Sequence, residues 1–219
     1  MRDIPVFTTE NGVASLGLRE IPYRKSAYVT IQDSSFLTEF LSECVDFCRA
    51  VGAETVYASG SDCLNSYPLY TTVIRMVASW EIIPEGKASL FPVTDQTLSR
   101  WREIYNDKMQ NVDNAAYMSE ANAKEMLKRG DGYFVHDHGK LLGIGIAADE
   151  RIDCIASVKP GCGREVLCSL KNAIISDRVV LDVASTNIRA IRLYESLGFI
   201  KAAEIKKWYK IFDMSRKNT

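Results

Sequence analysis

The chain has 219 residues, enough for one large domain or two small ones. With 47% hydrophobic and 25% charged residues and a net charge of −1, its composition is that of a globular protein and excludes a strongly basic nucleic-acid binder. No apolar run approaches the roughly 20 residues of a membrane helix, and the N-terminus lacks a secretory signal, so we expect a cytoplasmic protein without a membrane partner.

The first third of the chain favours strands around one helix. Phe36, Phe40, Cys44 and Cys48 recur at a spacing of four, which is typical of one face of an amphipathic helix. We interpret the two cysteines as buried apolar residues, because no further metal ligands follow at a fitting spacing. The expected elements are strands within 12–31, a helix from 36 to 52 capped by 33–35, a strand at 55–58, a polar loop at 59–66 and a strand at 70–80.

A turn-forming run, Pro84-Glu85-Gly86, separates this part from the rest. We therefore predict an N-terminal α/β region at residues 1–86 and a second domain at residues 87–219. A strand–helix–strand–strand order occurs in both parts, which raises the hypothesis that residues 1–86 are a shortened, degenerate copy of the second domain.

The second part alternates strands and helices more regularly. Thr94 and Ser119 can each cap a helix, and Gly130 can end the second one. His138-Gly139-Lys140 has the character of a hairpin turn. The expected elements are strands at 88–91, 133–135, 141–144, 152–158 and 179–184, helices after Thr94, from 119 to 130, from 164 to 175 and from 187 to 197, and a final strand pair reaching 212. This order predicts an α+β, three-layer fold with a mixed central sheet flanked by helices.

Two motifs stand out in the second part. A glycine turn, Gly161-Cys162-Gly163, joins an apolar strand to a helix, and glycines there let a ligand approach the backbone and the helix N-terminus. Further on, Asn187, Ala190 and Tyr194 are followed by Gly198 and Phe199. Ser185 or Thr186 can cap this second helix, and Gly198 suits the left-handed residue after its end, with Phe199 packing back onto the last turn.

Together these motifs resemble the acetyl-CoA site of the GCN5-related N-acetyltransferases over about residues 88–212. The second motif matches the family pattern Asn-x-x-Ala-x-x-x-Tyr-Glu-x-x-Gly-Phe. The family's turn, Arg/Gln-x-x-Gly-x-Gly/Ala, is matched at Gly163 but departs at Pro160 and Glu165. The resemblance implies an acyl-CoA N-acyltransferase-like fold and acetyl-CoA as co-substrate, with no metal. The coenzyme-binding residues that it implies are Ala156, Ser157, Val158, Gly161, Cys162, Gly163, Arg164, Glu165, Asn187, Ala190 and Tyr194.

The resemblance also implies roles within the site. The strand 152–158 would separate from its neighbour and pair with the pantetheine arm, most plausibly through Ala156, Ser157 and Val158. Asn187 would hydrogen-bond that arm, and Tyr194 would protonate the departing thiolate, since a tyrosine with a pKa near ~10 is protonated at neutral pH. Candidates for the base that deprotonates the amine remain open: Glu150, Asp153, Asp182, Tyr133 and the two histidines.

The implied activity is transfer of an acetyl group to a small-molecule amine or peptide acceptor, by direct attack in a ternary complex. A non-catalytic acyl-CoA-binding module and a protein N-acetyltransferase are the alternatives. Exposed strand edges would permit a homodimer without requiring one.

We interpret two further patterns as structural rather than as ligand sites. The run from Gly143 to Ala148 matches a dinucleotide fingerprint, but it is itself strand-like and no helix follows it, so we interpret it as a hairpin strand. His136-Asp137-His138 falls at a turn without an evident third ligand, which favours solvated turn residues over a metal site.

Overall fold

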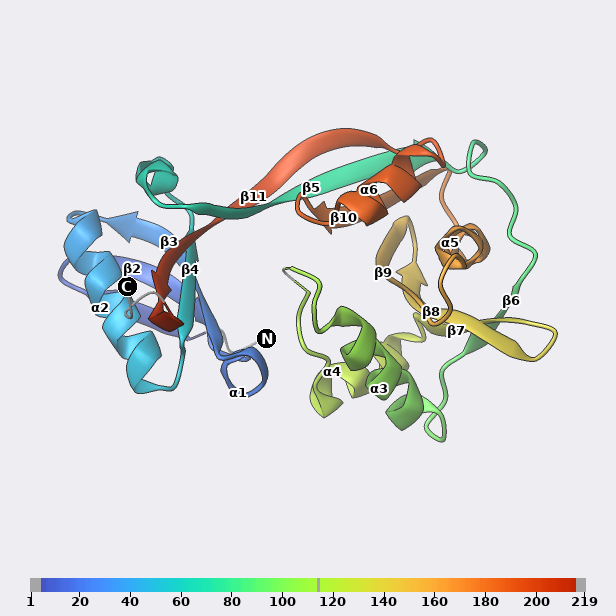
Figure 1. Cartoon of the computed structure of the whole chain (residues 1–219), viewed down its shortest axis with the longest axis horizontal. Coiled ribbons are helices and arrows are strands. Elements are labelled where there is room, and N and C mark those ends of the chain that lie inside the picture. Colours follow the sequence, from blue (N-terminus) through green and yellow to red (C-terminus); the bar gives the residue numbers. More distant parts are fainter. Residues whose placement is uncertain (1–4, 114, 216–219) are drawn as a thin grey trace. The chain divides into compact units, whose positions relative to one another are not determined.

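The computed structural model describes residues 5–113 and 115–215 (Figure 1). It divides into two compact units, Met1–Thr72 with Ile205–Thr219, and Val73–Glu204. The predicted boundary at residue 86 therefore lies inside the second unit. The physical reason is that two long strands, β5 (Leu69–Ser79) and β11 (Ile200–Asp213), each continue from one unit into the other.

The first unit is a small sheet covered by one long helix. Its strand order is β1-β2-β3-β4, with the end of β11 beside β4. As predicted, the helix α2 buries Phe40, Cys44 and Cys48. Phe36 was predicted on the same face but is exposed, and it is itself the N-cap, so the cap predicted within 33–35 is also wrong. The elements are β1 (Val6–Thr9), β2 (Gly12–Gly17), α1 (Ile21–Arg24), β3 (Ser26–Ser34), α2 (Leu37–Ala50), β4 (Thr55–Ser59) and the 3₁₀ helix η1 (Asp62–Ser66).

The second unit has the strand order β5-β10-β9-β8-β7-β6, and its β9–β10 pair is parallel while the other pairs are antiparallel. This confirms the predicted α+β class with a mixed sheet flanked by helices. The elements are β6 (Ser89–Pro92), α3 (Leu98–Met109), α4 (Glu120–Arg129), β7 (Gly132–Asp137), β8 (Lys140–Ala148), β9 (Arg151–Ser157), α5 (Gly163–Leu170), η2 (Lys171–Ala173), β10 (Arg178–Ala184) and α6 (Ile188–Glu195).

Alternation along the strands assigns a different core to each face of this sheet. Ile144 and Ile146 of β8 pack with α3 and α4. Gly143 and Gly145 lie on the opposite face, where an added Cβ would come within 2.6 Å of Val166 and 2.3 Å of Leu170 in α5. These glycines therefore allow α5 to pack closely on the sheet, which accounts for the apparent dinucleotide fingerprint.

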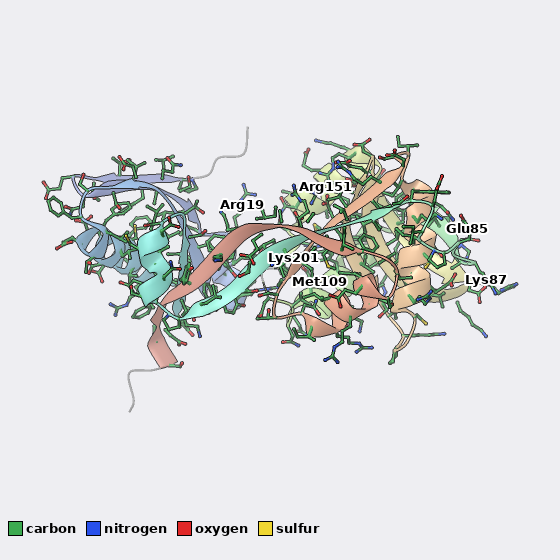
Figure 2. All side chains as sticks on the ribbon, turned by 90° about the horizontal axis from the view of Figure 1, so that it is seen from above. Arg19, Glu85, Lys87, Met109, Arg151 and Lys201 are labelled. Atoms are coloured by element: carbon green, nitrogen blue, oxygen red, sulfur yellow. The ribbon has the colours of Figure 1, made fainter. Side chains whose placement is uncertain are left out.

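The segment predicted as the domain boundary is held in place by the second unit (Figure 2 labels Glu85 and Lys87). Lys171 is 1% exposed. Its ammonium donates to the Ile83 carbonyl at 2.7 Å and to Glu85 at 2.9 Å. The same ammonium lies 3.7 Å from the centre of the Trp80 ring. A Cβ on Gly86 would lie 2.3 Å from the backbone nitrogen of Ser169. Gly86 thus serves close packing rather than flexibility.

Several local predictions are confirmed. The Ser119 hydroxyl caps α4 by accepting the N–H of Asn122, and Gly130 ends the helix with a φ of 72°. β7 and β8 form the predicted hairpin, with positive φ at His138 and Gly139.

Other local predictions differ from the structure. The helix predicted at 164–175 ends at Leu170 and continues as η2, and the predicted final strand pair is the single strand β11. Within the described residues, no helix has the length and apolar character needed to cross a membrane.

Candidate functional site

The central feature of the second unit is an opening between the parallel strands β9 and β10. Their ladder holds the pair Val180 with Arg151, and the Val180 N–H donates to the Glu150 carbonyl at 2.7 Å. Beyond this pair no register partner joins the two strands in the described part of the chain, although both run on for several residues. Their outer edges are paired with β8 and β5, so the inner edges face each other across a gap with backbone groups available to a ligand.

A β-bulge in β9 lies where the strands part. Ile146 of β8 pairs with Cys154, whereas the next residue, Ala147, pairs with Ile152, so Asp153 is the extra residue of β9. A bulge bends its strand and increases the local twist. The bulge at Asp153 is thus a physical cause for the separation of β9 from β10.

The direction of each backbone group along β9 follows from its pairing with β8. The Val158 N–H donates to the Leu142 carbonyl at 2.8 Å. Since successive residues of a strand face opposite neighbours, Ala156 also points its backbone groups at β8, while Ile155 and Ser157 point theirs into the gap. Of the three predicted residues, Ser157 alone therefore offers backbone groups to the gap. Ile155 was missed, because the sequence does not show which alternate residues pair with β8.

The first unit also contains a parallel strand pair, and this pair is closed. There the parallel strands β3 and β4 pair over five successive positions, from Ser26 with Thr55 to Thr30 with Ser59. The crossover helix between them, α2, starts after residues without glycine. The first unit therefore lacks, in its described residues, the opening that distinguishes the second.

The glycine turn lies between β9 and α5. Gly161 adopts a φ of 85°, a conformation that favours glycine. Cys162 is the N-cap of α5 and makes no side-chain cap, and the first intrahelical bond runs from the Val166 N–H to the Cys162 carbonyl. The N–H groups of Gly163, Arg164 and Glu165 precede that bond and point out of the helix end, which is the arrangement that binds phosphate.

The same turn lies against α6. A Cβ built on Gly163 would be 3.2 Å from the Leu193 Cδ2 atom of α6, so the first turn of α5 packs beside that helix. Arg164 is exposed, and Cys162 is half-buried.

Glu165 has a different role from the one expected. Its carboxylate accepts the backbone N–H groups of Lys87 and Ala88, the latter at 2.8 Å, and the Ser169 hydroxyl at 3.3 Å. The side chain thus anchors the segment before β6 to α5. These hydrogen bonds account for an acidic residue at this position of the turn without a ligand.

Asn187 is the N-cap of α6. Its side-chain oxygen accepts the N–H of Ala190 at 3.3 Å, so the predicted caps, Ser185 and Thr186, are wrong. Asparagine is among the best N-cap residues, and its position is thereby explained without a ligand. The cap uses only the side-chain oxygen, however, and the amide NH₂ group can still serve a ligand.

The end of α6 confirms the predicted Schellman motif. Gly198 has a φ of 90°, its N–H donates to the Glu195 carbonyl at 3.0 Å, and the Phe199 N–H donates to the Tyr194 carbonyl at 3.1 Å. Phe199 is buried, and its ring centre lies 5.9 Å from that of Tyr194. The end of α6 thereby fixes the ring of Tyr194.

The hydroxyl of Tyr194 stays protonated at neutral pH. Burial raises the pKa of Tyr194 well above its ordinary value, and the Cys154 thiol adds to the increase. Tyr194 is half-buried and packs against the hydrophobic cluster that contains Ile152 of β9. A protonated phenol can donate a proton but cannot serve as a base.

The carboxylates proposed as bases are all held by arginines. Asp182 is bound by Arg75 and Arg151, Asp153 by Arg151, and Glu150 by Arg178. Partial burial would raise the pKa of Asp182, but hydrogen bonds from Arg75 and Arg151 outweigh it and lower the pKa overall. A carboxylate with a lowered pKa is a poor base, which argues against Asp182 in this role.

The two histidines lie at the β7–β8 hairpin. His138 is exposed at the turn and pairs with Asp137 at 2.6 Å. His136 has a buried Nδ1 atom with no hydrogen-bond partner among the described residues. No group of three or more potential metal ligands occurs in residues 5–113 and 115–215.

Solved structures with the same fold are found at low sequence identity. A functionally unknown conserved protein from Staphylococcus epidermidis is 10% identical, with a TM-score of 0.58 over 96% of this chain and 94% of that one. A putative acetyltransferase from Pyrococcus horikoshii is 12% identical, with a TM-score of 0.59 over 93% and 71%. A GCN5-related N-acetyltransferase from Anabaena variabilis is also 12% identical, with a TM-score of 0.59 over 90% and 59%.

No family model matches the sequence, and the search of curated proteins finds no match either. The structural neighbours establish the fold, which is that of the acyl-CoA N-acyltransferases.

Proposed function

We propose that the protein is an acetyl-CoA-dependent N-acetyltransferase acting on an amine. The observation that carries this proposal is the opening between β9 and β10, because the backbone groups that face it and the helix end beside it match the parts of acetyl-CoA. Ile155 and Ser157 direct backbone groups into it, suited to the amides of a pantetheine arm. The N-terminus of α5 follows directly after β9 and suits a pyrophosphate.

The reaction would be a direct attack in a ternary complex. The neutral amine nitrogen forms a bond to the thioester carbonyl carbon, and the carbon–sulfur bond then breaks. Tyr194 gives its phenolic proton to the leaving thiolate and regains a proton from solvent or from the acetylated ammonium. Backbone N–H groups in the gap stabilise the oxyanion that forms on the carbonyl oxygen.

The acceptor is a small amine or the amine of a peptide. A non-catalytic acyl-CoA-binding module is the alternative that the ion pairs at Glu150, Asp153 and Asp182 favour, because they leave no free carboxylate base among these candidates. A water chain could deprotonate the amine without such a base.

The test begins with calorimetric titration of the full chain with acetyl-CoA and with desulfo-CoA. Desulfo-CoA is the control against a mixed disulfide at the half-buried Cys162. Saturable binding of both is expected. An amine panel with detection of released thiol then separates the two functions: acetyl transfer supports the enzyme, binding without transfer to any acceptor supports the binding module, and no binding contradicts both.

A further inference from the structure

A single arginine spans the point at which β9 and β10 part. Arg151 is the first residue of β9, and it pairs with Val180 of β10 just before the two strands separate. Its Nε atom donates to Asp153, the bulged residue of its own strand, at 3.1 Å, and its Nη2 atom donates to Asp182 of β10 at 2.9 Å. One planar guanidinium is thus bound to both sides of the opening. Figure 2 labels Arg151 on the sheet of the second unit.

The β10 end of this contact is fixed in turn by β5. Arg75 faces Asp182 directly in the β5–β10 ladder and binds both carboxylate oxygens, at 2.9 and 3.0 Å. Such bidentate pairs are the most directional of the charged hydrogen bonds. Asp182 is 24% exposed, so its bonds are less screened than those of a fully exposed ion pair. Asp182 therefore offers Arg151 a rigid anchor rather than a mobile one.

The position of the opening matters for the coenzyme. Backbone groups become available only beyond the last paired residue, so the place at which β9 leaves β10 limits how far a pantetheine arm can enter. A guanidinium bound to Asp153 and Asp182 sets that place, because moving it would stretch hydrogen bonds to both strands.

We infer that Arg151 is a positioning residue that fixes where the sheet opens and thereby where the thioester end of acetyl-CoA comes to rest. This inference rests on the proposed function. Arg151 acts through the two strands and takes no part in bond making. The nucleotide end of the coenzyme, which would lie at the N-terminus of α5, is outside its reach.

The test compares two Arg→Lys substitutions. Lysine keeps the positive charge but lacks the planar fork needed to bind Asp153 and Asp182 together. Arg178 is the matched control, because it joins β10 to Glu150, the residue just before β9, at 3.2 and 2.6 Å and thus at the closed end of the pair. For each variant the affinities for acetyl-CoA and for adenosine 3′,5′-bisphosphate, which lacks the pantetheine arm, are measured by calorimetry, together with Tm.

We expect Arg151→Lys to weaken acetyl-CoA binding about tenfold while the affinity for the bisphosphate stays unchanged, since the loss of one hydrogen bond between a displaced strand edge and the pantetheine arm has about this effect on affinity. Arg178→Lys should leave both affinities within about twofold of the wild type at a similar Tm. Asp153→Asn weakens only one arm of the contact, because it removes the charge of the carboxylate that accepts from Arg151. It is the second variant should Arg151→Lys not fold, and it should weaken acetyl-CoA binding selectively.

Three results would overturn the inference. They are wild-type affinity of Arg151→Lys for acetyl-CoA, an equal loss of both ligands, and the same behaviour in Arg151→Lys and Arg178→Lys. For Asp153→Asn, unchanged or non-selective binding counts against it in the same way. If the wild type itself binds no acetyl-CoA, the proposed function fails and this inference fails with it. If the wild type binds acetyl-CoA and only the variants give one of the contradicting results, this inference alone fails.

Discussion

At the scale of single residues, the contacts decide between roles that residue type leaves open. Glu165 and Asn187 were both expected at the coenzyme, yet Glu165 holds the segment before β6 and the Asn187 oxygen caps α6. Burial and Cys154 raise the pKa of Tyr194, so its hydroxyl is protonated at neutral pH, as the expected role as an acid requires. The contacts of single residues are therefore compatible with Tyr194 as an acid, and they assign structural roles to Glu165 and Asn187.

The substitution Tyr194→Phe tests the acid. It removes only the hydroxyl, so it should lower kcat by about a hundredfold, the typical contribution of a general acid, while the affinity for acetyl-CoA stays within about twofold. Thiol release and calorimetry measure the two quantities. A kcat equal to that of the wild type would remove Tyr194 from the mechanism.

The lowered pKa of Asp182 predicts a pH dependence of stability. A carboxyl whose folded pKa is depressed stabilises the protein above its unfolded pKa of about 3.9, and this stabilisation is lost as pH falls toward the folded pKa. Asp182→Asn should therefore cost about 1 kcal/mol at pH 7 and much less below about pH 4. Urea unfolding at several pH values measures this, and a pH-independent difference would contradict it.

At the scale of elements, the site depends on how two strands pair. β3–β4 and β9–β10 are both parallel pairs joined by a helix, but the first is closed over five positions while the second opens beyond the pair of Val180 with Arg151. The bulge at Asp153 lies at the start of that opening. A one-residue irregularity in β9 thus separates a structural strand pair from a candidate ligand site.

The cap of α6 allows a prediction that separates structure from binding. Asn187→Ala removes the cap and should destabilise the protein by about 1 kcal/mol. Asn187→Asp keeps a capping oxygen and removes only the amide donor, so its stability should match the wild type. If the amide contacts the pantetheine arm, both variants bind acetyl-CoA more weakly. Thermal unfolding and calorimetry measure the two effects, and wild-type affinity in Asn187→Asp would exclude the contact.

At the scale of the whole molecule, the two units share strands rather than a linker. Residues 73–79 of β5 pair with all of β10, from Ala184 with Val73 to Arg178 with Ser79. The segment after β5 is held by Lys171 and Glu165. The part of the chain that resembles an acetyltransferase in sequence is therefore not a separable domain.

A truncation tests this reasoning. A fragment of residues 87–219 keeps both sequence motifs but lacks β5, so the edge of β10 is unpaired and Asp182 loses Arg75. Exposed strand edges promote association, so we expect the fragment to aggregate in size-exclusion chromatography and to bind no acetyl-CoA. The full chain is the control. A monomeric fragment with the affinity of the full chain would show that β5 is dispensable.

Much of the local structure could be predicted from the sequence, because its causes are local. Apolar spacing identified α2, Ser119 and Gly130 bounded α4, and Gly198 with Phe199 ended α6. Local rules failed at the start of α6, where several neighbouring residues could cap the helix and Asn187, rather than Ser185 or Thr186, does so. They also failed at the C-terminal end, where the single long strand β11 replaces the predicted pair.

By itself, the sequence determined the α+β class, the order of the elements and the place of the glycine turn and of Tyr194, since periodicity, caps and turns depend on near neighbours in the chain. Only the tertiary structure decided which strands remain paired. The opening beyond Arg151, the gap-facing Ile155, the paired Asp182 and the shared strands β5 and β11 all depend on contacts between residues far apart in sequence. Hydrogen bonds between strands depend on register, and register is set by the packing of the whole sheet.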